Sequence, residues 1–210
     1  FLFCITVSSV FASHPPVHHE LTVTLDPSQS VAKFHDVITI PKSILESITS
    51  FRLNKSSEIE RIELSGNKVS IVSSSERFLK FDLPQSLEEG LAGPLKLVCI
   101  YTLPLPVSDN TMETLFISGS DYFYPQPEMK DKKTYRVTFK VKIQTPISLK
   151  VVSQGEKLKE IVENGNRTVI WKEERPQEEI LLIADRYHEF SKRHGSIALY
   201  AYLRDNDKAL

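Results

Sequence analysis

Apolar and polar residues alternate with period two along most of this chain, which is typical of β-strands with one buried face. The longest alternating run covers residues 134–145 and ends at a proline. The apolar residues on one face of this run are Tyr135, Val137, Phe139, Val141 and Ile143. Residues 19–26 and 30–40 alternate in the same way, with turn-forming residues between them. These two segments predict a hairpin that opens an antiparallel sheet.

Shorter segments with a similar pattern recur at regular spacing, separated by Gly, Pro, Asn and Ser residues that favour turns. They are residues 48–53, 59–64, 69–72, 78–83, 95–103, 149–155, 157–163, 167–172, 180–184 and 197–203. Asn164-Gly165 between two of these segments is a typical two-residue hairpin turn. About a dozen short strands, with no convincing amphipathic helix before the last residues, predict an all-β fold. We expect an antiparallel twisted β-sandwich or saddle.

Composition permits a packed domain and gives few indications of chemistry. The 210 residues are 40% hydrophobic and 25% charged, which favours a folded core over disorder. The net charge of -1 argues against a nucleic-acid partner bound through a broad basic face, although it leaves room for a local basic patch. Seven glycines offer little material for a Gly-rich phosphate-binding loop.

Residues 1–12 are uncharged and mostly apolar, and they end in Val10-Phe11-Ala12. The run is shorter than the roughly 20 residues that span a bilayer, and small residues occupy the positions that signal peptidase reads. We interpret it as a signal-peptide remnant, because the following His-Pro-Pro would interrupt the alternative, a buried first strand. The sequence thus predicts export, with no integral membrane segment in the mature chain.

The cysteines fit a bacterial periplasmic or extracellular location. Cleavage after Ala12 would remove Cys4, which leaves Cys99 as a lone residue in the apolar segment 95–101. Such a cysteine is expected to be a small core residue. The mature chain could then form no intrachain disulfide, which is less typical of animal secreted proteins.

The other end of the chain is predicted to begin a helix. Asp205 or Asn206 could cap it, but only about one turn follows before Leu210. A helix that short does not stand alone. We therefore expect residues 13–203 to form one β domain of a longer protein, with residues 204–210 starting the connection to a further domain.

The histidines do not form a convincing metal site. His14, His18 and His19 lie near Glu20, but an exposed, mobile N-terminal segment is the favoured interpretation. His35 is out of phase with Phe34 and is expected at the surface. His188-Glu189 begins like the zinc motif H-E-x-x-H, but position 192 is a lysine. The sequence therefore predicts no metal ligands in this chain.

Catalytic motifs are also lacking. The sequence contains no G-x-S-x-G nucleophile elbow, no P-loop and no G-x-G-x-x-G. The acidic pairs Glu88-Glu89, Glu173-Glu174 and Glu178-Glu179 are expected in solvated turns rather than in a glycosidase-like site. We predict no catalytic residue here.

The segment Tyr122-Phe-Tyr-Pro-Gln-Pro127 is the most unusual local feature. Three aromatic residues followed by Pro-x-Pro form a stiff segment. It could be a loop that faces a ligand or partner, or a loop that plugs one end of the sandwich. The residues alone leave both alternatives open.

From this segment onward the chain resembles the N-terminal β domain of the zinc aminopeptidase family that includes aminopeptidase N. The resemblance rests on the ordered series of the Tyr-Pro loop, the strand 135–143, Pro146, Val152-Ser-Gln-Gly155, Trp171, Arg175-Pro176 and Ile183-Ala-Asp-Arg-Tyr187. The early hairpin is similar to the family's opening strands. The family's "D-A-R" before the proline is absent, and Gln126 follows Pro125 where many members have Cys.

The resemblance implies a parent metallopeptidase that removes N-terminal residues from peptides. It implies no cofactor in this chain and zinc in a catalytic domain beyond Leu210. The implied partners are that downstream domain and the peptide substrate, toward which Glu113, Tyr122, Tyr124 and Gln126 would contribute. The alternative is a free-standing secreted β-sandwich module that binds a glycan or peptide through the aromatic segment.

Overall fold

The computed structural model describes residues 14–70, 73–82, 93–105, 115–131, 134–195 and 197–204. The predicted signal remnant, the predicted C-terminal helix start and Glu113 lie outside the described residues. Strands dominate the described part, as the alternating pattern predicts. Its helical elements are a single turn, α1 (Lys42–Leu45), and a short 3-10 helix, η2 (Gly119–Asp121).

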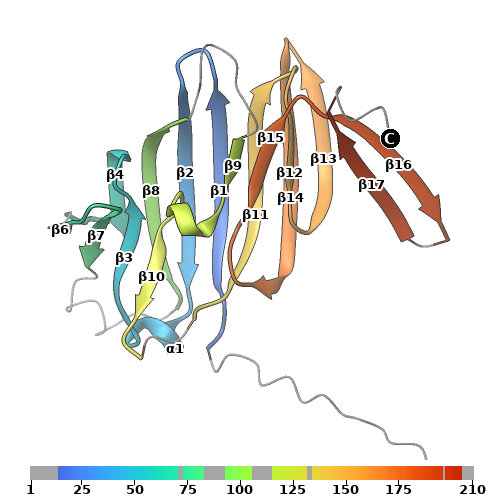
Figure 1. The fold of residues 1–210 in the computed structure, drawn as a ribbon. Helices are drawn as coiled ribbons and strands as arrows, with labels where there is room; N and C mark the ends of the chain where they lie inside the picture. Colours follow the sequence, from blue (N-terminus) through green and yellow to red (C-terminus); the bar gives the residue numbers. More distant parts are fainter. Residues whose placement is uncertain are drawn as a thin grey trace, which may run out of the picture.

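One large sheet of eight strands forms the body of the molecule (Figure 1). Its spatial order is β13 (Glu156–Glu163), β14 (Asn166–Gln177), β11 (Val137–Pro146), β1 (Val17–Asp26), β2 (Val31–Ile40), β8 (Leu95–Pro104), β4 (Glu58–Leu64) and β5 (Asn67–Lys68). Neighbouring strands are antiparallel except β1 and β11, which run parallel. The fold is thus all-β as predicted, but one central pairing is not antiparallel.

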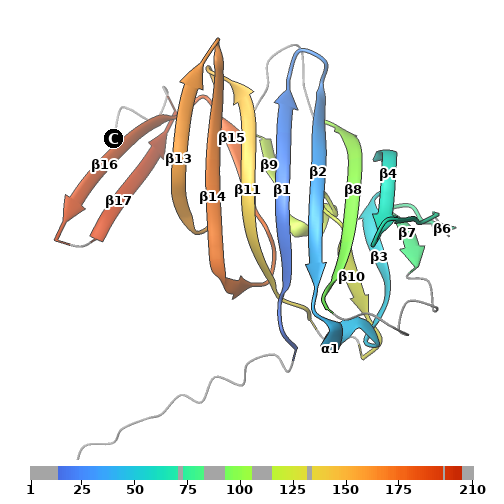
Figure 2. The ribbon, with the colours of Figure 1, turned by 180° about the vertical axis from the view of Figure 1, so that it is seen from behind.

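Two smaller sheets cover one face of the large sheet. The first contains β10 (Gln126–Met129), β3 (Ile48–Asn54), β7 (Phe78–Asp82) and β6 (Ser73–Ser74). The second contains β12 (Lys150–Ser153), β15 (Leu182–Asp185) and β9 (Leu115–Ile117). In the reverse view, the described elements leave the other face of the large sheet uncovered (Figure 2).

A two-stranded ribbon of β16 (His188–His194) and β17 (Ile197–Leu203) extends from the β13 side of the large sheet. We call it the C-terminal ribbon. The alternation did not predict β16, β9, β10, β5 or β6, because β16 is largely polar and the other four are very short.

The core lies between the large sheet and the two smaller ones. The alternating residues of β1, β2, β8 and β11 supply a large share of it, since one face of each strand is buried. Phe34 stacks on Tyr101 with ring centroids 4.9 Å apart, and Phe51 stacks on Phe81. Cys99 is fully buried there, as predicted, and burial raises the pKa of its thiol well above the ordinary range.

Candidate functional site

The aromatic segment 122–127 follows η2 directly, and its last two residues begin β10, the edge strand of the first smaller sheet. Ser118 and Asp121 close a capping box around η2, in which the Ser118 backbone N–H donates to the Asp121 carboxylate at 3.0 Å. Tyr122 then adopts a left-handed conformation with φ of 53°. This turn directs the next two side chains away from solvent.

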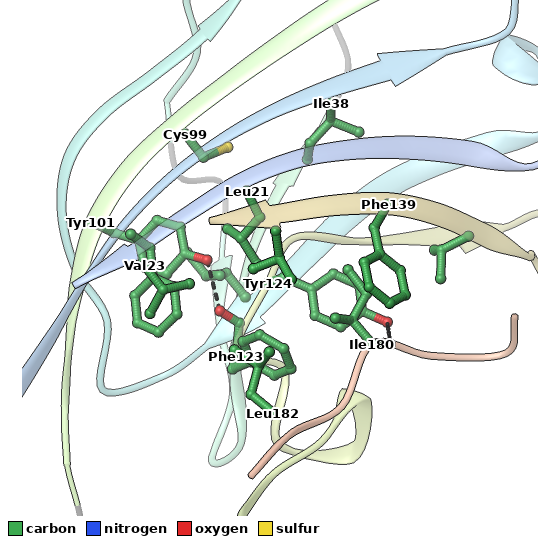
Figure 3. Close-up of a cluster of buried hydrophobic side chains, with 14 of the residues drawn as sticks. Leu21, Val23, Ile38, Cys99, Tyr101, Phe123, Tyr124, Phe139, Ile180 and Leu182 are labelled. Carbon is green, nitrogen blue, oxygen red and sulfur yellow. Dashed lines mark hydrogen bonds between the residues drawn. The ribbon is translucent and has the colours of Figure 1, made fainter. Parts of the chain in front are cut away.

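Phe123 and Tyr124 point into the core rather than outward (Figure 3). The Tyr101 hydroxyl donates to the Phe123 carbonyl at 2.7 Å, and the Tyr124 hydroxyl accepts from the Ile180 N–H at 3.4 Å. Burial raises the pKa of Tyr124 to about 12. The sequence left two alternatives open for this segment, a loop that faces a ligand and a loop that plugs one end of the sandwich. The burial of Phe123 and Tyr124 agrees with the second. In this conformation, the Tyr124 side chain cannot reach a ligand in solution.

Tyr122 is half-buried at the edge of the plug. Its ring packs on Phe78 at 5.3 Å, and the Arg77 guanidinium lies 5.8 Å from the ring centroid. The Asn54 N–H donates to the Tyr122 carbonyl at 2.8 Å. These contacts hold the partly accessible Tyr122 ring beside a cation. The predicted contact of Tyr122 with a peptide substrate stays a prediction.

Gln126 is half-buried, and its side-chain amide donates to the Gly119 carbonyl. The Gly119 N–H in turn donates to the Glu179 carboxylate at 2.8 Å. A Cβ at position 119 would lie 2.8 Å from the Glu179 Cβ, so this close approach needs glycine. Gln126 is thus engaged within the chain, and its predicted contact with substrate stays untested.

Glu179 corrects the expectation that Glu178 and Glu179 form a solvated acidic pair. Glu178 is exposed and lies 3.5 Å from Arg136, as a surface residue would. Glu179 is half-buried, and it joins the segment before β15 to η2. Glu173 is also buried, and it accepts the Arg175 backbone N–H at 2.9 Å. Two of the carboxylates assigned to solvated turns therefore satisfy backbone donors.

The histidines near the N-terminus likewise differ from the prediction. His18 and His19 lie in β1 rather than in a mobile segment, and the His19 side chain is fully buried. Its Nδ1 lies 2.8 Å from the carboxylate of Asp36, which is also fully buried. The sequence contained a signal for this burial, because His19 is in phase with Leu21 and Asp36 with Phe34. His35 is exposed, as predicted.

The neighbouring histidines point to opposite faces of β1, which prevents a shared metal site. His18 contacts the Thr138 hydroxyl at 2.8 Å on the outer face, and burial lowers its pKa. His14 lies 3.5 Å from Asp131. Within the described part of the chain, no cluster of three or more His, Cys, Asp or Glu residues could hold a metal ion. These residues therefore do not fit the zinc site of a metallopeptidase.

The C-terminal ribbon presents two chemically different faces. Glu189 and Tyr200 face the large sheet, where the Lys157 ammonium lies 2.8 Å from Glu189 and 5.4 Å from the Tyr200 ring centroid. The register places Phe190, Leu199 and Leu203 on the opposite face. Their side chains are 51%, 57% and 37% exposed. We call these three residues the outer ribbon face.

Exposed apolar side chains on a two-stranded ribbon that stands alone in water are energetically unfavourable. A lone hairpin is marginally stable in water, and clustered exposed apolar residues mark interaction sites. The ion pair between Lys157 and Glu189 fastens the inner side of the ribbon to β13. The outer ribbon face is therefore a candidate site for contact with another protein segment.

Among the described residues, no helix is long and apolar enough to cross a membrane. That finding concerns helices in these residues alone.

No protein-family model and no curated protein matches this sequence. Solved structures do match. An M1 zinc metallopeptidase from Deinococcus radiodurans is 16% identical with a TM-score of 0.60, over 88% of this chain and 46% of that chain. A variant of it bound to a Tyr-Ser-Ala substrate gives 16% and 0.61 over the same shares. A two-domain M1 zinc metallopeptidase variant bound to L-tryptophan gives 17% and 0.61, over 89% and 47%.

At such low identity the likeness concerns the fold. This chain spans slightly less than half the length of the metallopeptidases that it matches. The fold of this chain is thus similar, at the level of a domain, to part of the M1 zinc metallopeptidases.

Proposed function

We propose that this chain is a non-catalytic β domain of an exported zinc metallopeptidase-like protein. It would pack beside a downstream catalytic domain and contribute loops to the peptide cleft. The zinc and the reacting groups would belong to that second domain, since the described residues supply no suitable ligand set. The proposal that the protein is exported rests on the apolar residues 1–12.

The outer ribbon face is the observation that carries the proposed domain contact. Phe190, Leu199 and Leu203 lie on one face of the ribbon, where Lys192 and His188 pair with the two leucines, and Leu203 ends the last described strand. A domain that follows in the chain would therefore begin next to this face. Burial of a large apolar side chain contributes on the order of 1.5–3 kcal/mol, so three such residues could stabilise an interdomain contact.

The likeness to M1 zinc metallopeptidases supports the same proposal, because it covers nearly all of this chain and under half of theirs. The alternative, a free-standing module with an aromatic binding platform, is less well supported. Two of the three aromatic residues that would form the platform, Phe123 and Tyr124, are fully buried.

The test uses the protein together with its natural downstream sequence. We expect bound zinc by elemental analysis and release of N-terminal residues from short peptides. Substituting Phe190→Ser with Leu203→Ser should weaken the domain contact by about 2 kcal/mol, because half-exposed apolar surface would no longer be buried at the interface. Calorimetry should then resolve two unfolding transitions that are coupled in the unaltered protein.

The matched control is Leu158→Ser with Val162→Ser, which removes similarly exposed apolar side chains from β13. This control should keep the coupled transition. A stop codon directly after Leu210 would refute the proposed parent protein. Equal effects of the two double variants would refute the assigned contact face.

A further inference from the structure

Figure 2 shows the uncovered face of the large sheet, and the pairing registers of its strands place a regular row of basic residues on that face. The pairing registers align one residue from each of seven strands between β13 and β4. In spatial order these residues are Lys159, Ile170, Lys142, Thr22, His35, Ile100 and Arg61. Every second strand thus contributes a basic residue, and the row contains no acidic one. We call Lys159, Lys142, His35 and Arg61 the basic row.

All four residues of the basic row are exposed, whereas the three residues between them are half-buried. Neighbouring strands lie about 4.8 Å apart, so successive basic residues are about 10 Å apart and the row spans about 30 Å. Lys142 and Lys159 take part in no ion pair among the described residues, and Arg61 makes only a long contact of 3.7 Å with Glu63. Most of the positive charge in the row is therefore available to a ligand.

Polar residues flank the row on one side. The next register line contains Gln144, Thr24, Lys33, Thr102 and Glu58 on successive strands. The side-chain amide of Gln144 and the hydroxyls of Thr24 and Thr102 can donate to and accept from sugar hydroxyls. Ammonium and guanidinium groups form charge-assisted hydrogen bonds with carboxylates and sulfates. The face thus combines periodic cations with neutral hydrogen-bonding groups, and acidic residues lie beside the row, with Glu20 and Glu63 on the register line of its other side.

We propose that the basic row binds a linear acidic polysaccharide, with acidic groups on successive disaccharides meeting successive basic residues. The match lies in the spacing, because an acidic group on every second sugar recurs at a distance comparable to two strand separations. The uncovered sheet surface is open to an extended chain that crosses the strands. This inference does not depend on the proposed metallopeptidase role.

The same features fit other polyanions less well. Phosphates in a nucleic-acid duplex recur about every 3.4 Å along each strand, much closer than the basic residues. The row contains no Phe, Tyr or Trp on which single-stranded bases could stack. An anionic membrane surface would attract any exposed lysine of this face, including Lys96. It would therefore not favour the lysines of the basic row over those outside it.

The test titrates the full chain with decasaccharides of hyaluronan and of chondroitin sulfate at low salt. Substituting Lys142→Gln with Lys159→Gln should weaken binding about three- to tenfold, as expected for the loss of two exposed charge contacts. The control, Lys68→Gln with Lys96→Gln, removes the same charge from exposed lysines outside the row and should leave affinity nearly unchanged. Thermal melting checks that both double variants fold.

Binding that is lost in the first variant and kept in the second would support the proposal. Equal loss in both variants, or no binding of either polysaccharide, would overturn it. The same would follow if single-stranded DNA or phosphatidylserine vesicles bound more tightly than the polysaccharides through the same lysines. Neutral dextran should not bind.

Discussion

The buried pair of His19 and Asp36 offers the sharpest test of how this core is stabilised. Both side chains are fully buried, and His19 Nδ1 lies 2.8 Å from an Asp36 oxygen. The Tyr124 ring meets the imidazole edge-on at 5.1 Å, and Cys99 lies opposite Asp36 in the register of β2 and β8. The pair thus stands where the aromatic plug meets the large sheet.

The expected cost of breaking the pair follows from its burial. In Asp36→Leu, the imidazole would keep no partner, since His19 Nε2 has none among the described residues. Removal of one member of such a buried pair costs about 3–5 kcal/mol when the pair is charged. For a chain of about 200 residues, this corresponds to a melting temperature lower by about 6–20 °C. The double substitution His19→Leu with Asp36→Leu should recover most of that loss, because apolar replacements leave no buried polar group unpaired.

Urea unfolding followed by tryptophan fluorescence would measure these free energies. Trp171, the one tryptophan, lies on β14 and is almost fully buried. If Asp36→Leu unfolded at the wild-type urea concentration, the pair would not hold the core together. If the double variant were as unstable as the single one, packing rather than the uncompensated polar group would explain the loss.

Two further stability predictions concern a turn and a half-buried carboxylate. In Gly155→Ala, the new Cβ would lie 2.2 Å from the Lys172 carbonyl oxygen, so we expect a loss of about 2 kcal/mol or more in urea unfolding. Gly165→Ala, which also has positive φ but open space around it, should cost only about 1 kcal/mol; equal costs would contradict the assigned clash. Glu128 is partly buried, which raises its pKa, but hydrogen bonds from Ser50, Arg52 and Lys80 outweigh burial and lower the pKa. Its contribution is fully present above a glutamate's ordinary pKa of about 4.3 and is lost as the pH falls through the lower folded value. Glu128→Gln should thus be about 1–2 kcal/mol less stable than wild type at pH 7. The difference should shrink as the pH falls below about 4.3, and a constant difference from neutral into acid pH would refute the linkage.

Alternation carried most of the information about the fold. In β11 and β8, every second residue is buried, so the period-two pattern was sufficient to place strands there. It did not reveal that β1 and β11 pair in parallel, because strand direction depends on contacts more than 100 residues apart. The short strands β9 and β10 were also missed, since three or four residues cannot establish a period.

The candidate site was only partly predictable. Composition singled out residues 122–127, but burial of Phe123 and Tyr124 depends on the left-handed turn at Tyr122 and on Tyr101 from a distant strand. Glu179 escaped notice because its partner, the Gly119 N–H, is 60 residues away in sequence.

The all-β class, the buried Cys99 and the exposed His35 follow from the amino-acid sequence alone, because each depends on a local period that sterics impose on any strand. Which polar groups meet depends on how the strands pack in three dimensions. This packing pairs His19 with Asp36, separates the outer ribbon face from the sheet, and aligns the basic row across seven strands. Register and sheet order come from packing of the whole chain, and a one-residue shift in register would place each of these side chains on the opposite face.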